Sequence, residues 1–327
     1  MTTIAVTGAN GHLGNVVCRK LLEAGYRVKA LYHSTNEGLL NLPLELIQGD
    51  VLNPEDLKQL LSGCEEVIHC AGIISISGDP DGRVFLTNTE GPRNVLKASL
   101  ANGVKRIIHI SSVHAVTELP HTMPYDESRP YKRESDPVYD HSKAMGEQIL
   151  LDGAKDTALE VIILRPSSIV GPYDFKPSLL GAALLDFYQQ KIPFLPEGGY
   201  DFTDVRDVAE AVVNAIHMGR TGQAYILSGK YYNFRDFAEI IKQVTGKKVP
   251  KKVIPYRLLK ALLPLVTWYA KVSHSLPAFT KESIDAIFHG HPRMDSSKAI
   301  RELQYSFRPL EQSLRDFYEW QIERKKI

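Results

Sequence analysis

Cysteine, excess charge and long apolar runs are all scarce in this chain of 327 residues. Its three cysteines, Cys18, Cys64 and Cys70, cannot all pair and form no Cys-x-x-Cys, so we expect free thiols in a reducing compartment. The 39 basic and 38 acidic side chains leave a net charge of +1. That balance creates no overall field to attract nucleic acid or an anionic membrane, and we expect no nucleic-acid partner.

A membrane-spanning segment is also missing from the pattern. The most apolar late stretch, residues 254–279, is interrupted by Arg257, Lys260, Pro264 and Lys271, whereas a spanning helix needs about 20 mostly apolar residues. The first residues reach glycine too soon for a secretory signal. We therefore expect a soluble cytoplasmic protein. Surface contact between the basic and apolar segment 247–278 and a membrane stays open.

The composition is typical of a globular protein, with 43% hydrophobic and 24% charged residues. Short apolar runs alternate with helical patterns through the first two-thirds of the chain. Strands are predicted at 3–7, 27–31, 44–48, 66–70, 105–110, 160–164 and 223–227, and helices at 15–24, 54–61, 91–102 and 142–153. This alternation predicts an α/β fold in which a doubly wound parallel sheet has helices on both faces.

The rhythm changes after Gly171, where residues 171–203 are rich in proline and glycine. Residues 204–229 return to the strand and helix pattern, and the chain from 230 onward is mainly helical. We therefore predict a nucleotide-binding domain from 1–170 and 204–229. A smaller, mainly helical substrate-binding lobe is predicted from 171–203 and 230–327.

A glycine-rich turn follows the first predicted strand and opens the first helix. Residues 7–14 read TGANGHLG. Glycine lets the backbone approach a pyrophosphate and lets the helix pack close to the strand, while the N–H groups of the first helical turn point at the anion. The turn therefore predicts a dinucleotide site at the carboxyl end of the first strand.

TGANGHLG resembles the TGxxGxxG signature of the extended short-chain dehydrogenases/reductases, the NAD-dependent epimerase/dehydratase family. Asp50 matches the family's adenine-contacting acid, and Asn88 lies in a helix similar to the family's TNxxGTxNVL. LRPSSIVGP at 164–172 and FTDVRDVA at 202–209 resemble further elements, with Asp207 expected as a helix cap. The resemblance covers residues 3–230 and implies a Rossmann fold. The cofactor-binding residues it implies are Thr7, Gly8, Asn10, Gly11, His12, Leu13, Gly14, His33, Ser34, Asp50, Val51, Cys70, Ala71, Gly72, Asn88, Tyr139, Lys143, Pro166 and Ser168.

The end of the second strand bears on the choice of nicotinamide cofactor. NAD selection usually needs an acid there to bind the ribose 2′-hydroxyl, but the chain has His33 and Ser34, which could donate to a 2′-phosphate. The arginine common in NADP-preferring relatives is missing, and Glu37 lies nearby. We favour NADP, with NAD as the alternative.

Tyr139 and Lys143 are four residues apart, so they share one face of a helix. A phenol titrates near ~10, and a neighbouring ammonium is expected to lower that pKa so that the phenol can act as a general acid. Ser111 and Ser112 end the fifth predicted strand, where ligands of parallel sheets bind. The combination resembles the family's Ser–Tyr–Lys triad and implies that Ser112, Tyr139 and Lys143 are catalytic.

The residues around the triad indicate which of the family's reactions the chain resembles most. Dehydratases of the family carry Thr-Asp-Glu or similar at the strand-five serine, but Ser112 is followed by Val113, His114 and Ala115, which supply no carboxylate. The Val-Tyr-Gly and asparagine typical of many epimerases are replaced by other residues. The pattern is most similar to the dihydroflavonol-reductase-like branch, which implies reduction of a ketone or aldehyde. The alternatives are an NAD-dependent sugar-nucleotide epimerase and a non-catalytic dinucleotide-sensing regulator.

Loops above the strand ends provide candidate substrate contacts, and their aromatic residues favour an apolar or planar small molecule. The histidines lack a third ligand at a recognisable spacing, so no metal site is predicted. The family further implies a homodimer formed through the helices near 88–102 and 142–153. The candidate substrate residues are Val113, His114, Tyr125, Tyr173, Phe175 and Phe202.

Overall fold

The computed structural model describes residues 2–272 and 279–327, so residues 273–278 of the late apolar stretch lie outside the described residues. A seven-stranded sheet has the order β10-β6-β5-β4-β1-β2-β3, and every neighbouring pair is parallel. This arrangement confirms the predicted doubly wound sheet. Its strands are β1 (Thr3–Thr7), β2 (Arg27–Tyr32), β3 (Glu45–Gln48), β4 (Glu66–His69), β5 (Arg106–Ile110), β6 (Glu160–Pro166) and β10 (Gln223–Leu227).

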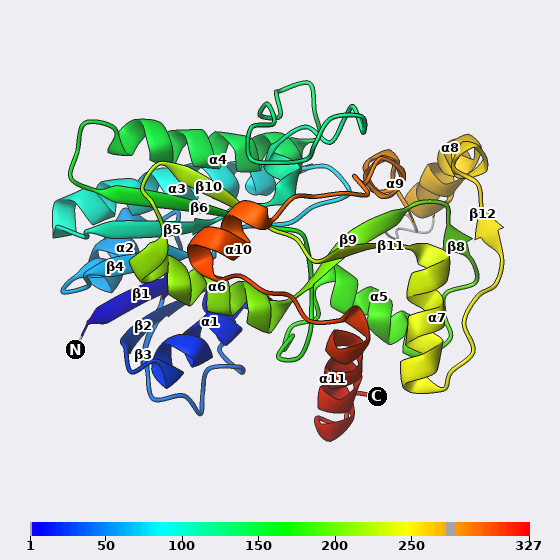
Figure 1. The fold of residues 1–327 in the computed structure, drawn as a ribbon, viewed down its shortest axis with the longest axis horizontal. Helices are drawn as coiled ribbons and strands as arrows, with labels where there is room; N and C mark the ends of the chain where they lie inside the picture. The colour runs from blue at the N-terminus through cyan, green and yellow to red at the C-terminus, as the bar shows by residue number, and fades with distance from the viewer. Residues whose placement is uncertain (1, 273–278) are drawn as a thin grey trace.

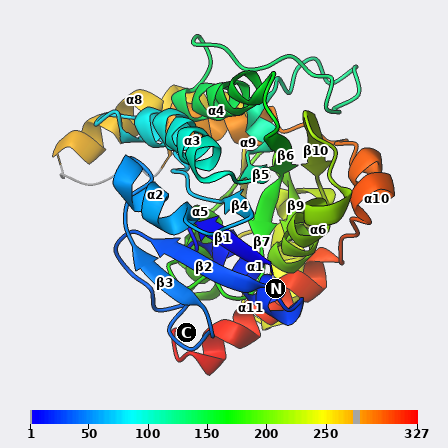
Figure 2. The ribbon, with the colours of Figure 1, turned by 90° about the vertical axis from the view of Figure 1, so that its left-hand side faces the viewer.

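Helices cover both faces of the sheet (Figure 2). Because side chains alternate along a strand, Ile4 and Val6 pack in one core with α1 (His12–Glu23) and α6 (Val205–Met218). Ala5 packs in a second core with α2 (Pro54–Leu61), α3 (Arg83–Asn102) and α4 (Val138–Ala154). The strand order reverses between β1 and β4, which is where open α/β sheets bind their ligands.

Side-chain carbonyl and carboxylate groups mark the starts of α2 and α3. α2 begins as predicted, because Asn53 accepts the N–H of Glu55 at 3.2 Å. α3 begins at Arg83, well before the predicted residue 91, because the Asp79 carboxylate accepts the N–H groups of Val84 and Phe85 at 2.9 and 2.8 Å. α4 begins at Val138 instead of the predicted residue 142, which places Tyr139 in its first turn.

Beyond the carboxyl ends of the large sheet, β7 (Ser168–Val170), β9 (Gly199–Asp204) and β11 (Lys230–Asn233) form a three-stranded sheet (Figure 1). Phe202 is 4% exposed and stacks on Phe237 at 4.6 Å within the core beside it. None of these strands falls in a predicted strand range. β9 runs through the stretch rich in proline and glycine, and β11 opens the segment that we predict as mainly helical. The surrounding elements are α5 (Leu179–Tyr188), β8 (Leu195–Pro196), α7 (Phe234–Thr245), β12 (Val253–Ile254), α8 (Tyr256–Val272), α9 (Lys281–Phe288), α10 (Ser297–Leu303) and α11 (Leu310–Glu323).

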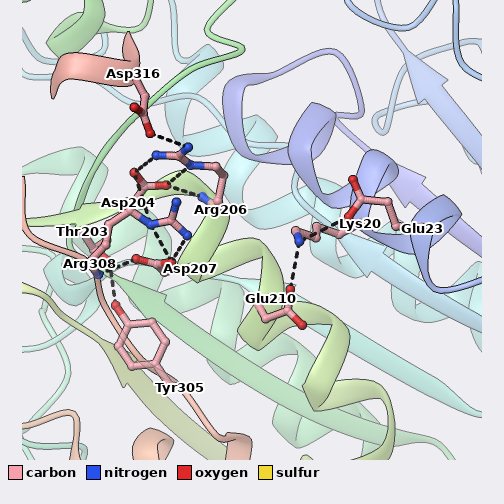
Figure 3. Close-up of polar contacts among 10 residues, drawn as sticks. All are labelled: Lys20, Glu23, Thr203, Asp204, Arg206, Asp207, Glu210, Tyr305, Arg308 and Asp316. Carbon is pink, nitrogen blue, oxygen red and sulfur yellow. Dashed lines mark hydrogen bonds and ion pairs between the residues drawn. The ribbon is translucent and has the colours of Figure 1, made fainter. Parts of the chain in front are cut away.

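A charged cluster at the start of α6 joins it to the C-terminal part of the chain (Figure 3). Asp204 caps α6 by accepting the N–H of Arg206 at 2.8 Å, and the Arg206 guanidinium also pairs with Asp316 of α11 at 2.6 Å. Asp207 is not the cap that we predict. Its carboxylate accepts the backbone N–H of Arg308 at 2.8 Å and pairs with the Arg308 guanidinium at 2.5 Å.

Residues 2–272 and 279–327 contain neither a membrane-spanning helix nor a cluster of metal ligands. No helix there has the length and apolar composition to cross a membrane. No group of three or more His, Cys, Asp or Glu side chains there could hold a metal ion.

Candidate active site

The glycine turn between β1 and α1 needs its glycines for two reasons. Gly8 has a φ of +64°, and a Cβ there would lie 2.7 Å from the backbone nitrogen of Ala71. A Cβ on Gly14 would lie 2.2 Å from the carbonyl oxygen of Gly8. Gly11 caps α1 without a side-chain bond, and the first turn carries no acid. This helix start can hold a pyrophosphate, because its N–H groups have no competing side-chain acceptor.

Asn10 and His12 tie the turn to neighbouring loops. Asn10 accepts the N–H of Gly38 at 3.1 Å through Oδ1 and donates to Thr35 Oγ1 at 3.0 Å. The His12 Nε2 lies 3.0 Å from the carbonyl oxygen of Pro172. Leu13 packs into the core beside the sheet.

The loop after β4 lies between the glycine turn and Lys143. Thr7 Oγ1 accepts the N–H of Ala71 at 3.3 Å. Asn88 accepts the N–H of Ile73 and donates to the carbonyl of the same residue, both at 2.9 Å. A Cβ on Gly72 would lie 3.7 Å from the Lys143 Nζ. Asn88 therefore shapes the loop that contains Cys70, Ala71 and Gly72, next to the amine.

Ser112, Tyr139 and Lys143 meet at the carboxyl edge of the sheet, and all three are buried. Ser112 follows β5, and its Oγ accepts the N–H of His114 at 3.1 Å. Tyr139 and Lys143 occupy successive turns of α4. The Lys143 Nζ donates to the carbonyl oxygen of Ile110, at the end of β5, at 2.7 Å. The geometry thus links the glycine turn, the β4 loop and the three side chains of the predicted triad.

Burial controls the protonation of this group. It raises the pKa of Tyr139 to about 12, against the opposing effect of a hydrogen bond with Ser112. Burial also lowers the pKa of Lys143 to about 8, although Glu147 favours the charged amine. The expected lowering of the phenol pKa by Lys143 is therefore not found. At neutral pH Tyr139 is a protonated phenol that can donate its proton.

A buried ion pair fastens α4 to β6 one turn beyond Lys143. The Arg165 guanidinium binds Glu147 through Nε at 2.9 Å and through its terminal nitrogen at 2.6 Å, and the two side chains are 3% and 0% exposed. Tyr131 donates to the same carboxylate at 3.0 Å. This network sets the position of the helix that carries Tyr139.

The loop after β2 contains the residues predicted to select the cofactor. His33 Nε2 lies 3.4 Å from Asp50 Oδ2, and Ser34 is exposed. Asp50 Oδ1 also accepts the N–H of Leu52 at 2.9 Å, and Val51 beside it is buried. Glu37 pairs with Arg324, which follows α11. The sequence shows no local signal for this last contact, because its partners are 287 positions apart.

The predicted substrate residues separate into four places. Val113 and Tyr125 pack in a buried cluster with Ile226, and the Tyr125 hydroxyl donates to the carbonyl of Val113. Tyr173 and Phe175 pack against Trp320 of α11, with ring centroids 6.0 and 5.1 Å away. His114 is beside Tyr139, and Phe202 is in the core between β9 and α7. Two of the predicted cofactor-binding residues follow the sixth strand of the large sheet: Pro166 is buried at the end of β6, and Ser168 is half-buried at the start of β7.

Comparison with known proteins decides the family. Residues 4–228 match the model of the NAD-dependent epimerase/dehydratase family. The chain belongs to this family. It is therefore an NAD(P)-dependent enzyme with a Rossmann fold.

Relatives and solved structures agree with this placement. The chain is 31% identical to sterol demethylase protein B of Methylococcus capsulatus over 93% of each protein. It is 30% identical to a putative dihydroflavonol 4-reductase of Synechocystis over 96% of this chain and 93% of that one. A crystal structure of gox2253 superposes with a TM-score of 0.87 at 31% identity over the full length of both chains. UDP-glucose 4-epimerase of Thermotoga maritima, at a TM-score of 0.81 and 22% identity, covers 99% of each chain and shares the fold.

Proposed function

We propose that this enzyme reduces a ketone or aldehyde to an alcohol with NAD(P)H, as in the dihydroflavonol-reductase-like branch. The observation that carries the proposal is the meeting of Ser112, Tyr139 and Lys143 at the carboxyl edge of the sheet, joined through the 70–73 loop to a glycine turn that fits a pyrophosphate. A phenol that holds its proton at neutral pH suits reduction, because the carbonyl oxygen gains a proton as hydride arrives. The relatives named as reductases support the same reaction.

The bound cofactor supplies a hydride from its nicotinamide ring. Tyr139 gives its proton to the carbonyl oxygen, and the Ser112 hydroxyl, whose oxygen already accepts the N–H of His114, donates a hydrogen bond to the same oxygen. Lys143, held by Ile110, contributes positive charge beside the reacting groups below its pKa of about 8. The glycine turn, the 70–73 loop, Asp50 and the residues from Pro166 to Ser168 hold the cofactor.

We propose NADPH as the preferred cofactor. The end of β2 carries no acid that would repel a 2′-phosphate, and the nearby Glu37 is neutralised by Arg324.

We also propose two domains with the boundaries predicted from the sequence, a homodimer and a cytoplasmic location. The exposed Phe85, Leu86 and Leu100 of α3 support a dimer through that helix, which light scattering can test.

A screen that follows NADPH and NADH absorbance tests the proposed reduction. The panel contains 4-phenylbutan-2-one, decan-2-one, a dihydroflavonol and cinnamaldehyde. We expect turnover on at least one compound, and we expect Tyr139→Phe to lower kcat by about 100-fold or more because the general acid is lost. Full turnover by Tyr139→Phe would show that another group supplies the proton.

The sugar-nucleotide epimerase alternative gives the opposite result in the same screen. The family model includes epimerases, and an epimerase shows no net redox change. Purified protein that retains NAD, oxidises no NAD(P)H across the panel and converts UDP-glucose to UDP-galactose would favour this alternative. Cofactor binding without turnover in either assay would favour a dinucleotide-sensing regulator.

A further inference from the structure

His114 is a titratable side chain that touches the proposed active site and that the proposed reduction does not use. It lies in a single helical turn, η1 (Val113–Ala115), directly after β5. Its backbone N–H binds Ser112 Oγ at 3.1 Å, and its ring centroid lies 6.1 Å from that of Tyr139. The His114 side chain is 35% exposed, whereas Ser112 and Tyr139 are buried. The imidazole is therefore the most accessible of the three groups.

Asp140 orients the imidazole. The His114 Nδ1 lies 3.5 Å from Asp140 Oδ1, which leaves Nε2 as the nitrogen for a bound molecule. The other oxygen of Asp140 lies 3.5 Å from the buried Lys132 Nζ, and Lys132 also pairs with Glu118 at 2.5 Å and Asp136 at 3.9 Å. Lys132, which is itself held by Glu118, thus keeps Asp140 in place beside His114.

The charges around His114 act in both directions. Asp140 and Glu118 raise its pKa, while burial and Lys132 lower it, and the net result is a raised pKa. Tyr139 also faces the ring but is a neutral phenol near neutral pH. A histidine beside a carboxylate, with one nitrogen free, is the arrangement expected of a general base that works near neutral pH.

We propose that His114, oriented by Asp140, is a second proton-transfer residue that removes and returns a proton on the carbon next to the substrate carbonyl. The proposal rests on the proposed function, because the carbonyl must be bound by Ser112 and Tyr139. The Nε2 lone pair takes the α-proton, and the electrons of the broken C–H bond form the C=C bond of an enol whose oxygen receives the Tyr139 proton. Reversal restores the ketone. There is no net oxidation or reduction, so the enzyme would also enolise its ketone substrate.

Deuterium exchange separates this step from hydride transfer. Each panel ketone is incubated in D₂O with wild-type enzyme and the oxidised cofactor, and α-deuteration is followed by NMR. Because the oxidised cofactor cannot reduce the ketone, exchange reports proton transfer alone. We expect enzyme-dependent exchange in the wild type and a loss of about 100-fold or more in His114→Gln. The matched control is His141→Gln, because His141 lies on α4 close to Tyr139 but packs against Phe85 at 5.6 Å, and it should exchange like the wild type.

The pH profile distinguishes a base from a structural residue. Exchange should rise with pH as His114 loses its proton, with a midpoint above 6.5 because its pKa is raised. Asp140→Asn should move that midpoint to lower pH, because it removes the anion that stabilises the imidazolium.

Three outcomes bear on the two proposals. Reduction accompanied by His114-dependent exchange with the shifted profile supports the second base. Reduction without exchange, or with equal exchange in His114→Gln, overturns the second base and leaves the reductase proposal standing. Neither reduction nor exchange on any panel ketone overturns both.

Discussion

At the residue scale, we expect the choice between NADPH and NADH to depend on His33, at the exit from β2. We expect His33→Asp to weaken NADPH binding by about tenfold or more, because a carboxylate there repels the 2′-phosphate and accepts from the 2′-hydroxyl of NADH instead. Fluorescence titration of both cofactors measures the change. His33→Gln is the control, since it removes the imidazole without adding charge and should change the NADPH to NADH ratio less. An unchanged ratio in His33→Asp would place the 2′-phosphate elsewhere.

Some residues of the site could be predicted from the sequence because their spacing is local. The glycine turn and the Tyr139–Lys143 pair each fall within a few positions, so a periodic pattern identifies them. The Glu37–Arg324 contact and the burial that raises the pKa of Tyr139 come from the folded chain, and no spacing signals either. For the same reason, the aromatic character of Tyr173 does not reveal that it packs against Trp320.

At the element scale, the strands were easier to predict than the helix starts. The seven strands of the large sheet are short apolar runs between turns, and each predicted range overlaps its strand. The starts of α3 and α4 lie upstream of the apolar periodicity. α3 starts at Arg83, close to Asp79, and α4 starts at Val138, directly after Pro137, so the apolar pattern alone places both starts too late.

The helix that carries Tyr139 should depend strongly on the buried Arg165–Glu147 pair. We expect Glu147→Gln to lower the free energy of unfolding by about 3 kcal/mol, because it leaves the Arg165 charge buried without its counter-ion. Urea unfolding measures this loss. Glu65→Gln is the matched control, since its pair with Lys105 is exposed and its loss should cost less than about 1 kcal/mol. Equal losses in the two variants would mean that burial adds nothing to the Arg165–Glu147 pair.

At the scale of the whole molecule, ion pairs join the start of α6 to the C-terminal segment that contains Arg308 and α11. Asp204 lies between β9 and α6, and the Arg206 and Arg308 guanidinium groups connect this point to the segment that ends in α11. Arg206 holds the pKa of Asp204 below its usual value. The stability that this carboxylate contributes is therefore present above pH 3.8 and is lost as the pH falls further.

Two buried histidines also make stability depend on pH. His69 of β4 and His109 of β5 lie on neighbouring strands of the large sheet, and their rings stack with centroids 5.2 Å apart. Among the described residues, neither nitrogen of His109 has a hydrogen-bond partner, and His69 Nε2 also lacks one. Burial lowers the pKa of His69 to about 3 and that of His109 well below its usual value, and Lys143 adds to both shifts. Both rings are therefore neutral in the folded protein at neutral pH.

These histidines should make the folded state less stable in acid. In the unfolded chain both take up protons below about pH 6.5, whereas in the folded chain they do not until about pH 3 for His69. Each histidine thus removes about 1.4 kcal/mol of stability per pH unit as the pH falls through this window. Glu66, whose pKa burial raises to about 7, acts in the opposite direction, so the difference between variants is the informative quantity.

His109→Phe keeps a buried ring but removes one titrating group, so its unfolding free energy should fall less steeply than that of the wild type between pH 6.5 and 4.5. The expected difference in slope is about 1.4 kcal/mol per pH unit, measured by urea unfolding at several pH values in this range. His33→Gln, at a side chain that is 63% exposed, should keep the wild-type slope. Parallel curves for His109→Phe and the wild type would mean that His109 takes up its proton in the folded state, which would require water or a rearranged partner to reach the stacked pair.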